Sequence, residues 1–156
     1  MAGNDRDIVY FDMDGVLVDF QSGIDRMTEE ELERYDEDHR DDCPGIFSRM
    51  DPAPGAIEAA KKIAEKYDVY ILSTAPWGNP SAWSDKLLWI KKHFGGSKDS
   101  IFFKRVILSH HKDLNIGAYL IDDNVGKGAA DFKGKHIHFG SDGFPDWESV
   151  LDYLRV

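Results

Sequence analysis

The sequence contains a single cysteine, Cys43, among its 156 residues. One thiol cannot form an internal disulfide or a cysteine-based zinc site, so neither kind of cross-link holds this fold. The sequence also lacks a run of about 20 apolar residues, the length that a membrane-spanning helix needs. Residues 1–7 are too polar for a signal peptide. We therefore expect a soluble, cytoplasmic protein that does not act on membranes.

Positive charge is scarce as well. The chain has 19 Lys and Arg residues against 29 Asp and Glu residues, which gives a formal net charge of -10. Binding to DNA or RNA depends on basic residues that offset the phosphate charge, so we expect no nucleic-acid polymer as partner. A small anion that binds together with a metal ion is still a possible ligand. Much of the negative charge lies in residues 25–42, which hold ten acidic residues and three arginines.

Hydrophobic residues make up 42% of the chain and are grouped in short segments. Continuous apolar runs that end at polar residues are typical of buried parallel strands, and helical patterns with one apolar face lie between them. Alternating strands and helices predict an α/β fold with a doubly wound parallel sheet, covered on both faces. The expected strands are 8–11, 69–72, 106–108, 118–121 and 136–139, and the expected helices are 54–66, 80–94 and 145–154.

Residues 21–50 interrupt this alternation. Thr28 and Glu31 have the spacing of a capping box, which predicts the start of a short charged helix. We therefore expect a core domain formed by residues 1–20 and 51–156, and a small helical cap insert formed by residues 21–50. We interpret the acidic residues of the insert as a helical face that is exposed to solvent. A sharper hypothesis is that its charges repel polyanions from a nearby site.

Polar residues follow four of the expected strands. In an open parallel sheet, ligands bind beyond the carboxyl ends of the strands, so these side chains should gather at one edge. Clustered carboxylates repel one another unless a cation lies among them or their pKa values rise. Mg2+ prefers hard oxygen ligands and leaves room for phosphate oxygens, so we expect a magnesium site. The residues concerned are Asp12, Asp14, Ser73, Thr74, Lys112, Asp122 and Asp123.

The segment Phe11-Asp12-Met13-Asp14-Gly15-Val16 resembles the first motif of the haloacid dehalogenase-like (HAD) superfamily. Thr74, Lys112 and the pair Asp122-Asp123 are similar to its second, third and fourth motifs, in the same order. Further segments resemble the 5'(3')-deoxyribonucleotidases within that superfamily, and the likeness covers nearly the whole chain except residues 21–50. These segments are 12–20, 52–56, 73–76, Lys86 with Trp89, and 120–123.

The resemblance implies a Mg2+-dependent phosphomonoesterase that acts on nucleoside 5'-monophosphates, with deoxyribonucleotides as the expected substrates. It implies Asp12 as the nucleophile that forms an aspartyl-phosphate, and Asp14 as the general acid and then the general base. Mg2+ would be held by Asp12, the backbone carbonyl of Asp14 and an acid of the final pair. The spacing from Lys112 favours Asp123 as the direct ligand, with Asp122 in support.

The same resemblance assigns the substrate contacts. Thr74 and Lys112 would bind the phosphoryl group, with Ser73 as a second hydroxyl donor, and Phe20 and Lys86 would line the substrate side. The chain departs from the close family in its acidic insert without tryptophan. This departure leaves the preference for a particular base and sugar open. The aromatic candidates for stacking on a base are Phe20, Phe47, Trp77 and Trp83.

Other interpretations of these residues stay open. Asp and Gly favour turns, so Asp12 to Gly15 can also be a simple strand-to-turn junction. The histidine pairs 110–111 and 136/138 suggest a transition metal, but no further ligand pattern accompanies them. A phosphatase for another small metabolite, a non-catalytic phosphate or nucleotide sensor and an acidic interaction protein are alternative functions. The sequence does not determine the oligomeric state, and a homodimer is one of the possible states.

Overall fold

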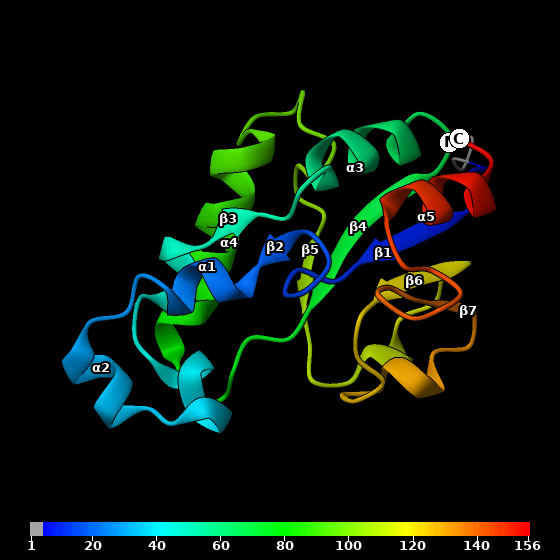
Figure 1. The fold of residues 1–156 in the computed structure, drawn as a ribbon. Helices are drawn as coiled ribbons and strands as arrows, with labels where there is room; N and C mark the ends of the chain where they lie inside the picture. Colours follow the sequence, from blue (N-terminus) through cyan, green and yellow to red (C-terminus); the bar gives the residue numbers. More distant parts are fainter. Residues whose placement is uncertain (1–4) are drawn as a thin grey trace.

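The computed structural model describes residues 5–156, so most of the polar segment at residues 1–7 lies outside the description. A parallel sheet of five strands forms the centre of the molecule, in the order β5-β4-β1-β6-β7 (Figure 1). The strands are β1 (Ile8–Phe11), β4 (Asp68–Ser73), β5 (Val106–Leu108), β6 (Tyr119–Asp122) and β7 (Lys135–His138). All five expected strands are present, and their ends differ by at most one residue from the apolar runs that predicted them.

The two faces of the sheet are covered unequally. The larger core lies on the face that carries Val9 and Phe11, and it includes residues of α3 (Ala56–Ala64), α4 (Pro80–Phe94) and α5 (Trp147–Leu154). Figure 1 shows α3 and α5 side by side. The other face carries Tyr10, Leu72 and Leu120. It is covered by the segment around the 3₁₀ helix η4 (Ala129–Asp131), through Ala129 and Phe132.

The two edge strands correct one expectation. The three residues of β5 are half-buried and β7 has one buried residue, Ile137, so neither strand is buried on both faces. β5 pairs only with β4 within the described sheet, so one side of the strand has no neighbouring strand to exclude solvent. A three-residue apolar run does not distinguish such an edge strand from a central one.

The segment between β2 (Val18–Asp19) and β3 (Asp51–Pro52) extends away from the main sheet (Figure 1). These two short strands pair antiparallel and bring both ends of the segment together. Between them lie α1 (Phe20–Ile24), α2 (Glu29–Arg34) and the 3₁₀ helices η1 (Glu37–Asp42) and η2 (Ile46–Arg49). The predicted capping box opens α2, where Thr28 and Glu31 bond to each other's backbone amides.

Specific polar contacts hold this segment in place. Arg49 donates two hydrogen bonds to the carboxylate of Glu31, at 2.7 and 2.9 Å, and the Cys43 thiol donates a third. The buried amide group of Asn79 donates to the carbonyl oxygens of Asp41 and Cys43. Asn79 also precedes α4, so the segment that carries η1 is tied directly to the start of that helix.

No helix in residues 5–156 combines the length and the apolar character needed to cross a membrane.

Candidate active site

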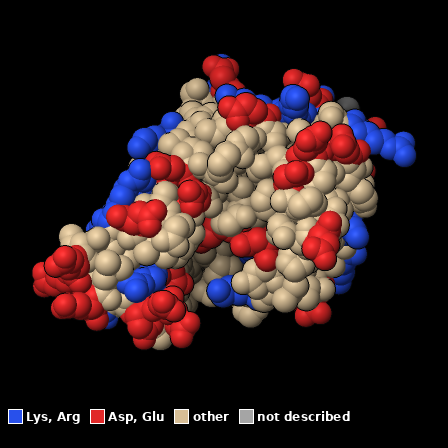
Figure 2. Space-filling model, viewed as in Figure 1, with Lys and Arg blue, Asp and Glu red and all other residues tan. Residues whose placement is uncertain are grey.

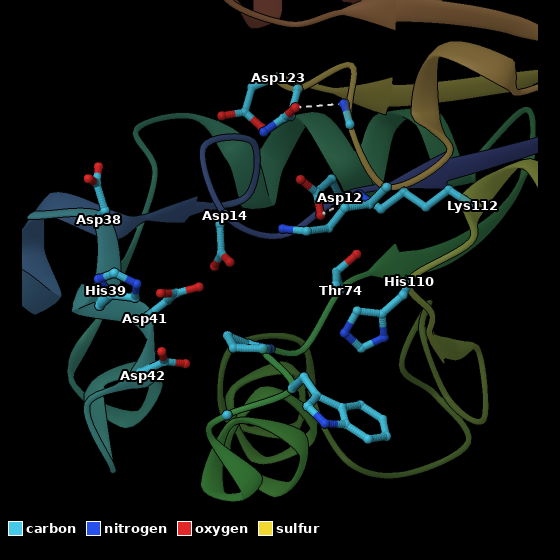
Figure 3. Close-up of a pocket in the computed structure, with 16 residues that line it drawn as sticks. Asp12, Asp14, Asp38, His39, Asp41, Asp42, Thr74, His110, Lys112 and Asp123 are labelled. Atoms are coloured by element: carbon cyan, nitrogen blue, oxygen red, sulfur yellow. Dashed lines mark hydrogen bonds and ion pairs between the residues drawn. The ribbon is translucent and has the colours of Figure 1, made fainter.

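A cavity of about 490 Å³ lies where the carboxyl ends of the central strands face the inserted segment. Figure 2 shows the surface hollowed between these two parts, with acidic side chains in the hollow. Figure 3 shows two groups of side chains facing each other across the cavity. The sheet side contributes Asp12, Asp14, Thr74, His110, Lys112 and Asp123, and the inserted segment contributes Asp38, His39, Asp41 and Asp42.

Three carboxylates meet at the ends of β1 and β6. Asp12, Asp122 and Asp123 each place one oxygen so that the three atoms lie within 4.8 Å of one another. Asp12 and Asp122 are buried, and Asp123 lines the cavity. Carboxylate oxygens at this spacing are a donor set that suits a hard divalent cation.

Gly15 allows this close approach. It adopts a left-handed backbone conformation, with φ of +76°, directly after the two aspartates of the first loop. A Cβ atom at Gly15 would overlap with the carboxylate of Asp123. The loop therefore needs glycine for its turn and for the space that Asp123 occupies.

Lys112 lies among the carboxylates. Its Nζ is 3.2 Å from Oδ1 of Asp12 and 2.5 Å from Oδ2 of Asp122, and its side chain is almost completely buried. Burial lowers the pKa of Lys112, but the charges of Asp12 and Asp122 outweigh this effect and raise it above its usual value. A permanently charged ammonium group is therefore fixed at the floor of the cavity.

One lysine does not neutralise the acidic cluster. Burial, together with the charge of Asp12, raises the pKa of Asp122 to about 7 and that of Asp123 to about 6. Asp122 already accepts hydrogen bonds on both oxygens, from Lys112 and from the backbone amide of Asn124. Asp123 therefore has the greater freedom to bind a ligand in the cavity.

Asp14 occupies a different environment from Asp12. Its Oδ2 accepts a hydrogen bond of 3.0 Å from Nζ of Lys86, whereas its Oδ1 is buried without a partner in the described part of the chain. Burial raises the pKa of Asp14, and Lys86 offsets part of that rise. A carboxyl group with a raised pKa holds a proton more readily near neutral pH, as a general acid must.

The two hydroxyl groups at the end of β4 have different surroundings. Thr74 lines the cavity and donates a hydrogen bond of 2.7 Å to the carbonyl oxygen of Ser109. Ser73 is fully buried, and its hydroxyl accepts a hydrogen bond from Lys86. Lys86 is also fully buried, so both residues lie behind the cavity surface rather than in its wall.

Phe20 also lies outside the lining of this cavity. Its ring packs against Phe47 at 6.0 Å between centroids, and Nζ of Lys86 lies 4.7 Å from the centroid of Phe47. The two phenyl rings therefore shield the lysine that bonds to Asp14. Neither the burial of Lys86 nor this aromatic cover has a signal in the sequence.

The structure also places residues near the site that belong to none of the predicted motifs. His136 and His138 stack on one face of β7, and their Nε2 atoms bond to the carbonyl oxygens of Asp122 and Asp123, at 3.1 and 3.0 Å. Only the alternation of the two histidines along a strand indicated that both would contact the same partner, which is the backbone of the Asp122-Asp123 pair. The cavity is also lined by Trp77 and Lys127, neither of which belongs to a motif.

Comparison with known proteins identifies the family of this chain. Residues 35–148 match the family model for 5' nucleotidase, deoxy (pyrimidine), cytosolic type C protein. A Vibrio phage KVP40 protein, assigned by name as a 5'(3')-deoxyribonucleotidase, is 55% identical over 150 residues, which cover 96% of this chain and 85% of the relative. The cytosolic-type 5'(3')-deoxyribonucleotidase of Homo sapiens is 26% identical over 171 residues, covering 92% of this chain and 78% of that protein.

Proposed function

The chain belongs to the deoxy (pyrimidine), cytosolic type C family of 5' nucleotidases, and we propose that it is a Mg2+-dependent phosphatase of deoxyribonucleoside 5'-monophosphates. The family and the names of its relatives make it a phosphoric monoester hydrolase that acts on nucleotides. The observation that carries the finer proposal is the placement of two aspartates in unlike environments. Asp12 lies beside Lys112, and Asp14 lies beside Lys86.

Asp12 is the nucleophile in this proposal. Its carboxylate lies at the floor of the cavity, and the ion pair with Lys112 holds it in place to attack phosphorus. Attack forms an aspartyl-phosphate and breaks the bond between phosphorus and the nucleoside oxygen. Lys112 and Thr74 contact the phosphoryl oxygens, and the lysine offsets the charge that spreads over them in the transition state.

Asp14 transfers the protons. In the first step it donates its proton to the departing nucleoside oxygen, and in the second it accepts a proton from the water that hydrolyses the aspartyl-phosphate. The bond to Lys86 holds Oδ2 in place, so we assign Lys86 and Ser73 to positioning Asp14 rather than to contact with substrate or phosphate. Phe20 contributes through Phe47, whose ring covers Lys86.

Asp12, Asp123 and the backbone carbonyl of Asp14 are the groups that would hold Mg2+, with Asp122 in support. The chemistry of the oxygen donors and the raised pKa values of Asp122 and Asp123 fit a divalent cation. When bound, Mg2+ would neutralise negative charge on the phosphoryl group and on the carboxylates.

Residues 21–50 form a small cap over the core in this proposal. Their contribution to the cavity comes from the loop of η1, where Asp38, His39, Asp41 and Asp42 face the sheet residues (Figure 3). A cap on this side would surround the nucleoside part of the substrate, because the phosphate groups are bound by the sheet side.

Phosphate release tests the proposal. The substrates are ribo- and deoxyribonucleoside monophosphates, sugar phosphates and p-nitrophenyl phosphate, each with Mg2+ or with EDTA. We expect Mg2+-dependent release, fastest with a deoxyribonucleotide and lowered at least about a thousandfold by Asp12→Asn. Asp142→Asn is the matched control, because Asp142 is exposed and lies outside the cavity lining.

The alternatives give different results. Faster release from a sugar phosphate would identify a phosphatase for another small metabolite. No release from any substrate by folded protein with Mg2+ would reject the enzyme and favour a phosphate or nucleotide sensor.

A further inference from the structure

Trp77 is an indole on the wall of the cavity with little protein around it. It lies in the loop between β4 and α4, three residues after Thr74, and 85% of its surface is exposed. Exposed aromatic surface of this size is unfavourable in water, and most tryptophans bury it. The same side chain lines the cavity that contains Asp12 and Thr74. It therefore offers an apolar ring face within the space that the substrate would enter.

His110 supports the indole from the neighbouring loop. It follows β5 and also lines the cavity. Its ring centroid lies 6.0 Å from that of Trp77 in an edge-to-face arrangement, and 6.1 Å from that of Trp83. Such contacts favour a defined orientation of the ring over free rotation.

The other aromatic candidates are placed unfavourably for this role. Phe47 is only 3% exposed and covers Lys86, and Phe20 packs against Phe47. Trp83 is 38% exposed but does not line the cavity. Among residues 5–156, Trp77 is therefore the one phenyl or indole side chain in the cavity wall.

We propose that Trp77, supported by His110, is the stacking surface for the nucleobase and makes the enzyme prefer nucleotides to phosphate esters that lack a base. This inference rests on the proposed function, because it assigns the nucleoside part of that substrate. Stacking on an aromatic side chain accepts any base, since every base has a flat π face. Trp77 accordingly selects for the presence of a base rather than for its identity.

Two substrates that differ only in the base test the assignment. We compare KM and kcat for thymidine 5'-monophosphate and for 2-deoxyribose 5-phosphate in wild type, Trp77→Ala, Trp77→Phe and Phe103→Ala. Trp77→Ala should raise KM for the nucleotide about tenfold or more, with less than a twofold change for the base-free ester. Trp77→Phe should restore most of the loss. Phe103 is another exposed aromatic residue outside this cavity, so its variant should match wild type.

A binding measurement separates this inference from the proposed function. Thymidine 5'-monophosphate is titrated into Asp12→Asn protein with Mg2+, and tryptophan fluorescence is followed. Quenching that disappears in Asp12→Asn/Trp77→Ala supports the stacking role even if the wild type releases no phosphate. Equal changes in KM for both substrates, or unchanged quenching and KM in Trp77→Ala, would overturn the stacking role while leaving the phosphatase intact. Because Trp77 is highly exposed, its replacement should leave the fold intact, and thermal unfolding checks this.

Discussion

The ammonium group of Lys86 lies 3.0 Å from Oδ2 of Asp14, although Lys86 itself has no exposed surface. The two residues are 72 positions apart in the chain. Lys86 enters the core from α4 and also bonds to Ser73 at the end of β4. A buried lysine with these two partners has little freedom to move, so it fixes both the position and the charge balance of Asp14.

Replacing Lys86 by methionine removes that control. Lys86 lowers the pKa of Asp14 against the larger effect of burial, so its loss should raise this pKa further. Asp14 would then stay protonated to higher pH and would accept a proton from water less readily. We expect Lys86→Met to shift the acid limb of the kcat profile to higher pH and to lower kcat at pH 7 by about tenfold or more.

The control is Lys91→Met, which removes an exposed lysine from the same helix. It should leave the pH profile in place. A Lys86→Met enzyme with an unshifted profile would show that Asp14 is not governed by this lysine, whatever happens to its stability. We expect the free energy of unfolding to fall by about 1–3 kcal/mol, because Ser73 and Asp14 lose a buried partner.

The acidic cluster should make stability depend on pH and Mg2+. Asp122 and Asp123 have pKa values of about 7 and 6, above the usual value near 3.9 of an unfolded chain. Between about pH 4 and pH 7 the folded state therefore binds more protons than the unfolded state. These two residues make the metal-free protein less stable as the pH rises through that range. Mg2+ should reverse the loss, most strongly above pH 7, where both carboxylates are charged.

Thermal unfolding at pH 5 and pH 7.5, with EDTA or with Mg2+, measures this effect. We expect Mg2+ to raise Tm clearly at pH 7.5 and much less at pH 5. Asp123→Asn should reduce both the pH-dependent loss and the stabilisation by Mg2+. Equal stabilisation at the two pH values would contradict a site made of these carboxylates.

Much of the fold follows from the sequence, because a buried parallel strand requires a continuous apolar run. The runs around Val9, Val69 and Leu120 identify central strands, and the proline at position 80 and glycine at position 95 mark the limits of α4. The sequence likewise predicts that Asp12 and Thr74 lie at one edge of the sheet, because both follow parallel strands and parallel strands end on the same side.

The sequence could not predict contacts that depend on tertiary packing. The stretch around Lys86 has the pattern of a charged helix face. Only the packing of α4 against η2 and the bond to Ser73 at the end of β4 bury this lysine. The position of the acidic segment is another case. Asn79 fixes η1 by donating hydrogen bonds to backbone carbonyl oxygens 36 and 38 residues away. Every residue has a backbone carbonyl, so the sequence does not show which of them Asn79 will bond to.

Gly15→Ala tests whether the first loop serves the metal site. Alanine at a φ of +76° costs about 1–2 kcal/mol in any protein, and here its Cβ would also displace Asp123. We expect Mg2+ affinity, measured by calorimetry, to fall about tenfold or more, with a matching loss of kcat/KM. Gly55→Ala is the matched control, because Gly55 has a φ of +75° and no atom within 4 Å of the added Cβ. Similar Mg2+ affinity in the two variants would mean that Asp123 does not bind the ion.

The acidic segment presents two different sets of charges. Asp38, Asp41 and Asp42 line the cavity, whereas Glu29, Glu30 and Glu33 are exposed on α2 and lie outside the lining. The hypothesis that this segment excludes polyanions therefore applies to the aspartates of η1. Charges across a cavity act over distances shorter than the screening length of about 8–10 Å, while those on a remote surface are largely screened.

Two triple variants with the same change in net charge separate these sets. Asp38→Asn/Asp41→Asn/Asp42→Asn should lower KM for a nucleoside diphosphate relative to the monophosphate, by about tenfold at low salt. Glu29→Gln/Glu30→Gln/Glu33→Gln should leave that ratio unchanged. The asparagine substitutions spare the anchor of η1, because Asn79 bonds to the backbone carbonyl of Asp41 rather than to its side chain. Equal effects of both triples would assign the discrimination to the overall charge of -10. No effect of either would show that the acidic segment does not select among phosphates.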